Sequence, residues 1–240
     1  MSNEVKYKRI LIKISGEALA GNKGTGINFD TVMGVSERIK ECLDLGVQVA
    51  IVVGAGNFWR GRSGNTMDMT RADHMGMLAT MMNALALQDT FIKIGVDARV
   101  LAAIDMQQFA EPYIRDKAVA HLVHGRVVIF GCGTGNPFFT TDTAAALRAI
   151  EISADIALLA KNVNGVYTAD PKLYPDSEKY SRITYTEILK RQLKVIDATA
   201  AALCKENKMP ILLFALGNGD NIIKAVKGEN IGTIISDDPA

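Results

Sequence analysis

Four short segments combine glycine or small polar residues with basic side chains, a composition suited to binding phosphate. The segments are residues 13–17 (KISGE), 54–61 (GAGNFWRG), 131–137 (GCGTGNP) and 161–165 (KNVNG). Glycine lets backbone N–H groups approach an anion closely, and a following helix N-terminus adds positive potential. Lys13, Arg60 and Lys161 supply positive charge in three of these segments. Together these features predict a phosphorylated ligand.

Two standard phosphate-binding motifs do not match these segments. The GxGxxG pattern fails after Gly54 and Gly56, because Trp59 takes the third glycine position. The GxxxxGK[ST] pattern fails at residues 56–63, because Arg62 stands where lysine is required. Neither a dinucleotide-binding fold nor a P-loop is supported, so phosphate binding requires another scaffold.

The elements that must position these segments alternate along the chain. The apolar runs predicted as strands are residues 9–14, 47–53, 98–103, 127–130, 156–160 and 211–214. The predicted helices are residues 31–45, 71–94, 141–152 and 198–207. Continuously apolar runs are typical of strands covered on both faces, and strand–helix alternation favours parallel pairing. We therefore predict a three-layer α/β/α sandwich around a mainly parallel sheet, with the glycine-rich segments at its carboxyl edge.

Two stretches break this regular pattern. Residues 162–182 are polar, contain two prolines and are too long for an ordinary connection, which predicts a functional loop or lid. Residues 71–94 carry more apolar side chains than one core-facing stripe requires. We therefore expect a second face of that helix to pack on another subunit.

Composition excludes several classes of protein. With 48% hydrophobic and 22% charged residues over 240 positions, the chain is not mainly disordered. A net charge of +1 argues against electrostatic binding of nucleic acid by the whole chain. No apolar run reaches the roughly 18 residues of a membrane span, and the N-terminus has no signal-peptide pattern, so we expect a cytoplasmic protein. Cys42, Cys132 and Cys204 are too far apart for a zinc motif and are predicted to be buried.

Five blocks of sequence carry a family signal. They are residues 13–19 (KISGEAL), 54–61 (GAGNFWRG), 73–80 (DHMGMLAT), 133–144 (GTGNPFFTTDTA) and 164–171 (NGVYTADP). In content and order they resemble the bacterial-type UMP kinases of the amino acid kinase family, over nearly the whole chain. The block at residues 133–144 is the most specific. One departure is Ala55, where this family often has glycine; alanine keeps the backbone N–H but disfavours positive φ.

The resemblance implies a fold and an activity. It implies one domain over residues 1–240 with a mainly parallel sheet of about eight strands, the acceptor side in the N-terminal two thirds and the donor side in the C-terminal third. It implies transfer of the γ-phosphoryl group of ATP to UMP, giving UDP and ADP, in the pyrimidine synthesis that leads to CTP. It further implies activation by GTP, inhibition by UTP and a homohexamer, with no nucleic-acid or membrane partner.

Catalytic roles follow from the same resemblance. Lys13 and Arg60 are expected at the transferring phosphoryl group, and Asp142 is expected to hold Lys13 or Mg²⁺ in place. Asp197 is a candidate for the same organising work. Mg²⁺ is expected as the cofactor with ATP, held mainly by ATP phosphates, with Asp142 as the candidate protein ligand. Each residue also has an alternative role without catalysis: Lys13 as a strand-end lysine, Arg60 as a surface arginine, and the aspartates as helix caps.

Binding residues are also carried over from the resemblance. Those expected at ATP are Lys13, Ile14, Ser15, Gly16, Gly56, Arg60, Asn162, Tyr167 and Asp170. Those expected at UMP are Ala55, Asp73, Thr134, Gly135, Asn136, Pro137, Phe138, Phe139, Thr140 and Thr141. The segment expected to respond to GTP is Gly21, Asn22, Lys23, Gly24, Thr25 and Gly26. Asp73 is assigned to the ribose hydroxyls and is also a natural helix N-cap, whereas Phe138 and Phe139 have the core as an alternative.

Two other functions remain open at this point. A carboxylate or carbamate kinase is disfavoured by Asp73 and residues 134–141, which suit a nucleotide acceptor. A nucleotide-binding storage or sensor protein without turnover is disfavoured by Lys13 and Asp142.

Overall fold

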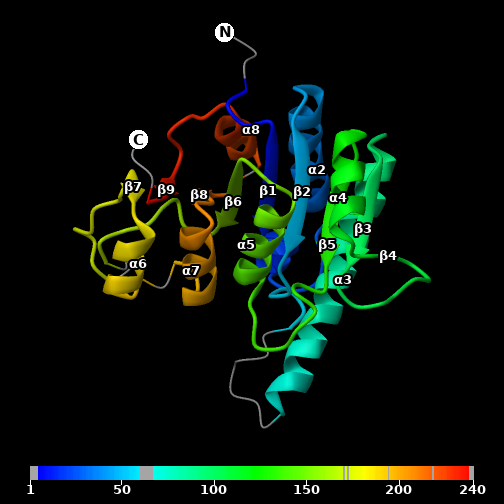
Figure 1. Ribbon diagram of the computed structural model, residues 1–240, viewed down its shortest axis with the longest axis horizontal. Coiled ribbons are helices and arrows are strands. Elements are labelled where there is room, and N and C mark those ends of the chain that lie inside the picture. Colours follow the sequence, from blue (N-terminus) through cyan, green and yellow to red (C-terminus); the bar gives the residue numbers. More distant parts are fainter. Residues whose placement is uncertain are drawn as a thin grey trace.

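In the part of the chain that the structure describes, nine strands form one central sheet (Figure 1). The computed structural model describes residues 5–59, 67–169, 171, 173–193, 195–217 and 219–237. The strands are β1 (Arg9–Ile14), β2 (Gln48–Val53), β3 (Ala98–Ala102), β4 (Glu111–Pro112), β5 (Val127–Gly131), β6 (Ile156–Lys161), β7 (Arg182–Ile183), β8 (Ile211–Ala215) and β9 (Thr233–Ile235). Their order is β4-β3-β5-β2-β1-β6-β8-β9-β7, and neighbouring strands are parallel except β8 and β9.

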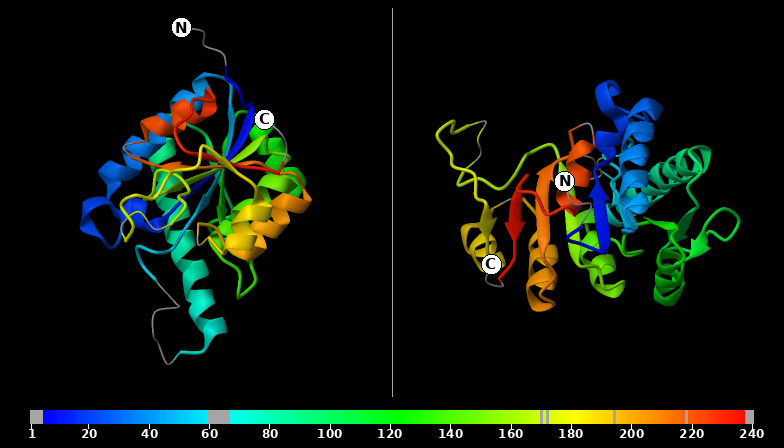
Figure 2. Two further views of the ribbon diagram at one scale, coloured as in Figure 1. Left: turned by 90° about the vertical axis from the view of Figure 1, so that its left-hand side faces the viewer. Right: turned by 90° about the horizontal axis from the view of Figure 1, so that it is seen from above.

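Helices cover both faces of this sheet (Figure 2). They are α1 (Gly16–Ala20), the 3-10 turn η1 (Gly21–Lys23), α2 (Phe29–Asp44), α3 (Met69–Lys93), α4 (Arg115–Val123), α5 (Thr141–Glu151), α6 (Tyr185–Arg191), α7 (Ala198–Glu206) and α8 (Asp220–Val226). The layer of α1, α2, α3 and α8 lies on one face, and α4, α5, α6 and α7 lie on the other. The predicted three-layer architecture is confirmed.

The central strands are buried on both faces, and successive side chains of β1 divide between the two layers. Ile10, Ile12 and Ile14 pack in the core under α2, whereas Leu11 packs in the core under α5. This alternation follows from the two-residue period of a strand. Lys13 therefore points to the α5 side. The same register carries over to β6, which is paired in parallel with β1.

The six predicted strands and four predicted helices all occur, with ends that differ by at most two residues. The sequence patterns did not predict β4, β7 and β9, which have only two or three residues each, and they gave no bounds for α1, α4, α6 and α8. The three cysteines are buried as predicted. Within the described residues, no helix combines the length and the apolar character needed to cross a membrane.

Candidate active site

Lys13 and Lys161 project from neighbouring parallel strands toward the same carboxylate. Lys13 lies in β1 and Lys161 ends β6, and both belong to the side of these strands that faces α5. Asp142, the second residue of α5, lies between them. Its Oδ1 is 3.0 Å from Nζ of Lys13, and its Oδ2 is 2.7 Å from Nζ of Lys161. We call these three residues the lysine–aspartate cluster.

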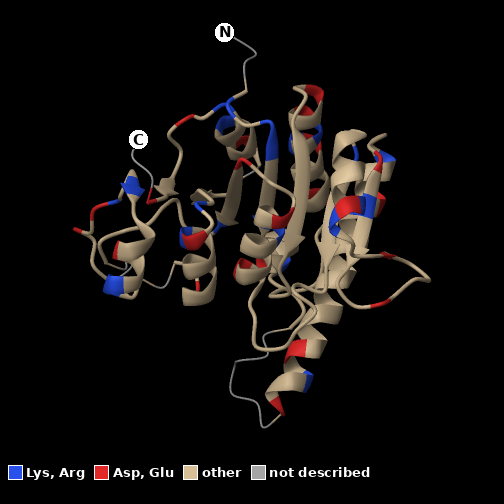
Figure 3. Cartoon of the chain, in the orientation of Figure 1, with Lys and Arg blue, Asp and Glu red and all other residues tan. Residues whose placement is uncertain are grey.

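The lysine–aspartate cluster holds a local excess of positive charge. Lys13 is only 8% exposed. Burial alone would raise the pKa of Asp142, but the ammonium groups of Lys13 and Lys161 outweigh it and hold that pKa below the ordinary value of 3.8. Asp142 is therefore ionised at neutral pH, and two cations face one anion. Basic and acidic residues are interspersed over the surrounding helices (Figure 3). Such a site suits a phosphate group.

Asp197 fastens the start of α7 to the start of α5. It caps α7 by accepting a hydrogen bond from the Ala200 N–H at 2.9 Å. It also accepts from the Thr143 hydroxyl at 2.9 Å and from the Thr140 hydroxyl. Thr140 in turn accepts from the Asp142 N–H at 3.1 Å. These contacts support a positioning role for Asp197, and its predicted catalytic role stays a prediction.

The first two glycine-rich turns pack directly against each other. A Cβ added to Gly16 would lie 2.4 Å from Oδ1 of Asn57 and 2.7 Å from the Gly56 nitrogen, so only glycine fits there. Ser15 caps α1 by accepting from the Ala18 N–H at 3.2 Å. The Ile14 side chain is buried in the core, so only its backbone faces the edge. The predicted ATP residues Ile14, Ser15, Gly16 and Gly56 are thus brought together.

The second turn accommodates alanine without strain. Ala55 is not at positive φ, so replacing the usual glycine costs nothing in backbone conformation. Its carbonyl accepts hydrogen bonds from the backbone N–H groups of Phe58 and Trp59, both at 2.9 Å. Arg60, predicted to be catalytic, lies outside the described residues, and so does Asp170, predicted to contact ATP.

A cavity of about 100 Å³, here called the α3 pocket, lies between α3 and residues 132–141. It is lined by Ala55, Asp73, Gly76, Met77, Thr80, Cys132, Gly133, Thr134, Asn136, Phe139, Thr140 and Thr141. Most residues predicted at UMP are therefore gathered around one space. Gly135, Pro137 and Phe138 belong to the same loop but do not line the pocket.

Asp73 links α3 to this loop, and its predicted capping role is wrong. Asp68 caps α3 instead, accepting from the Arg71 N–H at 3.1 Å, and Asp73 lies inside the helix, which begins at Met69. Oδ2 of Asp73 accepts a hydrogen bond from the Phe138 N–H at 2.7 Å. Phe138 has a φ of 72°, which is uncommon for a residue with a side chain. Phe138 and Phe139 are both exposed, which rules out the core alternative.

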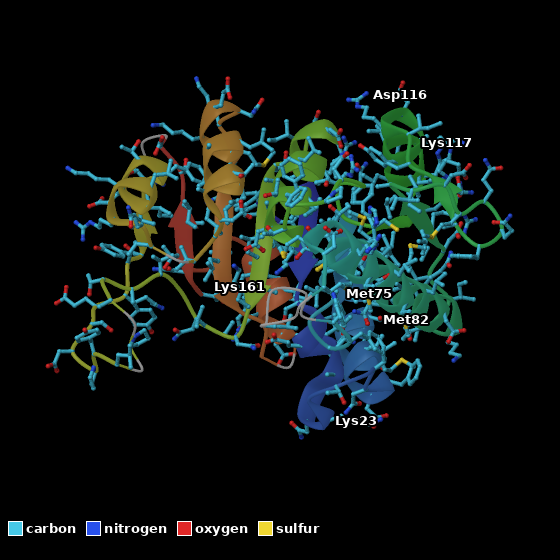
Figure 4. The ribbon with its side chains drawn as sticks, turned by 90° about the horizontal axis from the view of Figure 1, so that it is seen from below. Lys23, Met75, Met82, Asp116, Lys117 and Lys161 are labelled. Carbon is cyan, nitrogen blue, oxygen red and sulfur yellow. The ribbon has the colours of Figure 1, made fainter. Side chains whose placement is uncertain are left out.

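Three cavities meet at Lys161 on the opposite side of the cluster from the α3 pocket. The α7 cavity, about 470 Å³, includes Asp142 and Asp197 in its lining, and the Tyr167 cavity, about 430 Å³, includes Val163, Tyr167 and Pro171. The α2 cavity, about 780 Å³, includes Asn162. Asn162 and Tyr167, both predicted at ATP, therefore line different cavities. Figure 4 shows Lys161 at the end of β6.

The predicted GTP segment begins beside Asn162. Gly21 and Asn22 line the α2 cavity with it, whereas Lys23 is exposed at the periphery (Figure 4). At the other end of the segment, the Gly26 N–H donates to the Asn57 carbonyl at 2.9 Å. The segment is therefore joined to the second glycine-rich turn.

The donor set of the site fits a metal ion that arrives with a nucleotide. Among the described residues, no group of three or more His, Cys, Asp or Glu side chains could hold a metal ion. Oδ1 of Asp142 is buried, and Nζ of Lys13 lies 3.0 Å from it as its ion-pair partner. Mg²⁺ usually combines one or two carboxylates with substrate phosphates, and Asp142 is the carboxylate beside the two lysines that can supply one ligand.

Lys161 is the residue whose importance the sequence analysis missed. Its charge was noted beside a glycine-rich segment, but it was given no site role. The available signal is that it directly follows the strand predicted at residues 156–160, at the same edge as Lys13. Only the sheet register brings the two lysines to one carboxylate.

Comparison with known proteins identifies the family of this chain. The model of the amino acid kinase family matches residues 8–215, and the chain belongs to this family. It is similar to the crystal structure of a UMP kinase from Bacillus anthracis, with a TM-score of 0.93 and 38% identity over 97% of each chain. A UMP kinase from Ureaplasma parvum matches with a TM-score of 0.91 and 39% identity, over 96% of this chain and 99% of that one. A uridylate kinase from Archaeoglobus fulgidus matches with a TM-score of 0.73 and 31% identity, over 95% and 99%.

Proposed function

We propose that this chain is a UMP kinase that transfers the γ-phosphoryl group of ATP to UMP, giving UDP and ADP. The observation that carries the proposal is the lysine–aspartate cluster, with the α3 pocket on one side and the cavities around Lys161 on the other. The similarity to two UMP kinases at 38% and 39% identity over nearly the whole chain supports the choice of acceptor.

In this reaction a phosphate oxygen of UMP attacks the γ-phosphorus. The bond from that phosphorus to the β,γ-bridging oxygen breaks, and ADP leaves with the bond's electron pair. Such a transfer depends mainly on alignment and on positive charge around the transferred group. Lys13 and Lys161 supply that charge, and Asp142 fixes both ammonium groups. Because its pKa is lowered, Asp142 stays ionised and acts by positioning rather than as a proton carrier.

Magnesium enters this proposal as part of the donor nucleotide. When bound, Mg²⁺ would offset the negative charge of the donor phosphates. Among the described residues, the carboxylate of Asp142 is the group at this site that would hold it.

On the acceptor side, the α3 pocket offers the groups that a nucleoside monophosphate needs. Asp73 supplies a carboxylate for ribose hydroxyls, and Thr134, Asn136 and Thr141 supply polar groups for the base and phosphate. On the donor side, the ring of Tyr167 and the side chain of Val163 offer an apolar surface for adenine.

Regulation and assembly belong to the same proposal. The resemblance supports activation by GTP through residues 21–26, inhibition by UTP, a homohexamer and a cytoplasmic enzyme that feeds CTP synthesis. Exposed apolar residues on the outer face of α3 support assembly in particular: Leu78 and Met82 are 54% and 51% exposed. Burying such residues against another copy is favourable.

A coupled assay of ADP release tests the acceptor. The purified protein is mixed with ATP, Mg²⁺ and one of UMP, CMP, carbamate or acetylglutamate. We expect rapid ADP release with UMP and a much slower rate with the others. Faster turnover of carbamate or acetylglutamate would show that the chain is a carbamate or carboxylate kinase. No ADP release with any acceptor would favour a nucleotide-binding protein without turnover.

A further inference from the structure

Two buried asparagines, one on α3 and one in the second glycine-rich turn, form a closed amide pair. Asn57 donates from Nδ2 to Oδ1 of Asn83 at 2.9 Å, and Asn83 donates from Nδ2 to Oδ1 of Asn57 at 2.8 Å. Both side chains are buried, with Asn83 at 0% exposure. When every donor and acceptor in a buried polar network has a hydrogen-bond partner, the network holds the surrounding segments rigidly in one arrangement.

The remaining N–H groups of the pair reach two further segments. Asn83 donates to the Gly54 carbonyl at 2.8 Å, which holds the second turn onto α3. Nδ2 of Asn57 donates to the Gly26 backbone carbonyl at 2.7 Å, and the backbone carbonyl of Asn57 accepts from the Gly26 N–H at 2.9 Å. All four amide hydrogens are therefore used.

The amide pair also packs against the first glycine-rich turn. The Cα of Gly16 comes so close to Asn57 that a Cβ there would lie 2.4 Å from its Oδ1. Three segments, namely the turn after β1, the turn after β2 and the end of residues 21–26, thus meet at Asn57. Asn83 is the side chain that holds Asn57 in place from α3.

We propose that Asn83, acting through Asn57, is a positioning residue that fixes the spacing of the first and second glycine-rich turns for phosphoryl transfer. This inference rests on the proposed function, because it assigns the two turns to the phosphates of the reaction. Alignment of reacting groups is sensitive to displacements of about 1 Å, which cost on the order of 10²-fold in rate. Asn83 itself lies away from the α3 pocket lining, so its loss acts on alignment more than on acceptor affinity.

The test compares two substitutions of Asn83 with one control. Asn83→Leu keeps the side-chain volume but removes all three hydrogen bonds, and Asn83→Ala leaves room for water to satisfy the freed groups, so that the fold survives. The control is Thr90→Val, which removes a different buried polar group, a hydroxyl, from α3. That hydroxyl donates to the Ala86 carbonyl at 2.9 Å and contacts neither turn.

Two measurements separate positioning from general destabilisation. We expect both Asn83 variants to lower kcat by about ten- to hundredfold, with the KM for UMP changed by less than about threefold. Thr90→Val should keep the wild-type kcat. Hydrogen exchange should accelerate by about tenfold at residues 21–28 in the Asn83 variants only.

The outcomes are distinguishable from failure of the proposed function. If the wild-type enzyme is active and Asn83→Ala keeps its kcat, the positioning role is wrong whatever the exchange data. If the wild-type protein makes no UDP, the proposed function fails, and exchange at residues 21–28 alone decides whether Asn83 holds these segments. Slow exchange there in both Asn83 variants would then overturn the inference.

Discussion

Lys13 and Asp142 form a buried ion pair, with Nζ of the lysine 3.0 Å from Oδ1 of the carboxylate. The same carboxylate binds Lys161 through its other oxygen at 2.7 Å. The two ammonium groups repel each other. The carboxylate of Asp142 offsets this repulsion, so both lysines can lie at one edge of the sheet.

Lys13→Met should lower kcat with little change in the KM for UMP. Negative charge shifts during transfer, so a contact with the transferred group is stronger in the transition state. Losing such a contact costs about 3–4 kcal/mol, or 10²–10³ in rate. Steady-state kinetics check this, with Lys40→Met as the control, since Lys40 forms an exposed pair with Asp44 on α2. A Lys13→Met enzyme with normal kcat would remove Lys13 from the chemistry.

Asp73→Asn should raise the KM for UMP and leave the KM for ATP nearly unchanged. A charge-assisted hydrogen bond contributes about 1.5–3 kcal/mol, so we expect a ten- to hundredfold increase. Asparagine can still accept from the Phe138 N–H, so the loop should keep its conformation. Asp68→Asn on the same helix is the matched control, because asparagine caps helices as well as aspartate does. A folded Asp73→Asn enzyme with normal UMP affinity would contradict the assignment.

Asp142→Asn should destabilise the protein at neutral pH and have a smaller effect in acid. Breaking a buried ion pair costs about 3–5 kcal/mol. Because the folded-state pKa of Asp142 is below 3.8, its ionised form stabilises the protein above that pH, and this stabilisation is lost as pH falls through the lowered value. Urea unfolding of both proteins at pH 7 and at decreasing acid pH measures the difference. An equal difference at every pH would show that the charge of Asp142 does not stabilise the fold.

The outer face of α3 should mediate self-association. Met75 and Met82, labelled in Figure 4, lie on this helix with Leu78 between them in sequence, and all three are exposed. We expect light scattering to show an oligomer at micromolar concentration and Leu78→Asp to reduce its mass. Leu173→Asp, at an exposed position in a loop, is the control and should leave the mass unchanged. A wild-type monomer under these conditions would contradict this prediction.

The central strands and the main helices were predictable because their apolar runs are long and continuous. β4 and β7 have two residues each, and β9 has three, so no periodicity exists to identify them. Their pairing depends on where the neighbouring strands lie. The same limit explains why the apolar runs predicted six of the nine strands that the structure describes.

The candidate site was predictable in its parts but not in its connections. The sequence identified Lys13, Asp142 and residues 134–141 from residue types and family resemblance. It could not show that Lys161 shares the carboxylate, since this depends on the register between β1 and β6. Nor could it show the hydrogen bond from Phe138 to Asp73, which joins two segments far apart in the chain.

Direct detection of the transferred phosphoryl group tests the central claim most sharply. The wild-type protein and Lys13→Met are incubated with Mg²⁺, UMP and ATP labelled at the γ-phosphate, and the products are separated by chromatography. We predict that the label appears in UDP with the wild-type protein, in an amount equal to the ADP formed, and at a rate lower by about 10²–10³ with Lys13→Met. Label found only in ATP or in inorganic phosphate would contradict the proposal that this chain phosphorylates UMP.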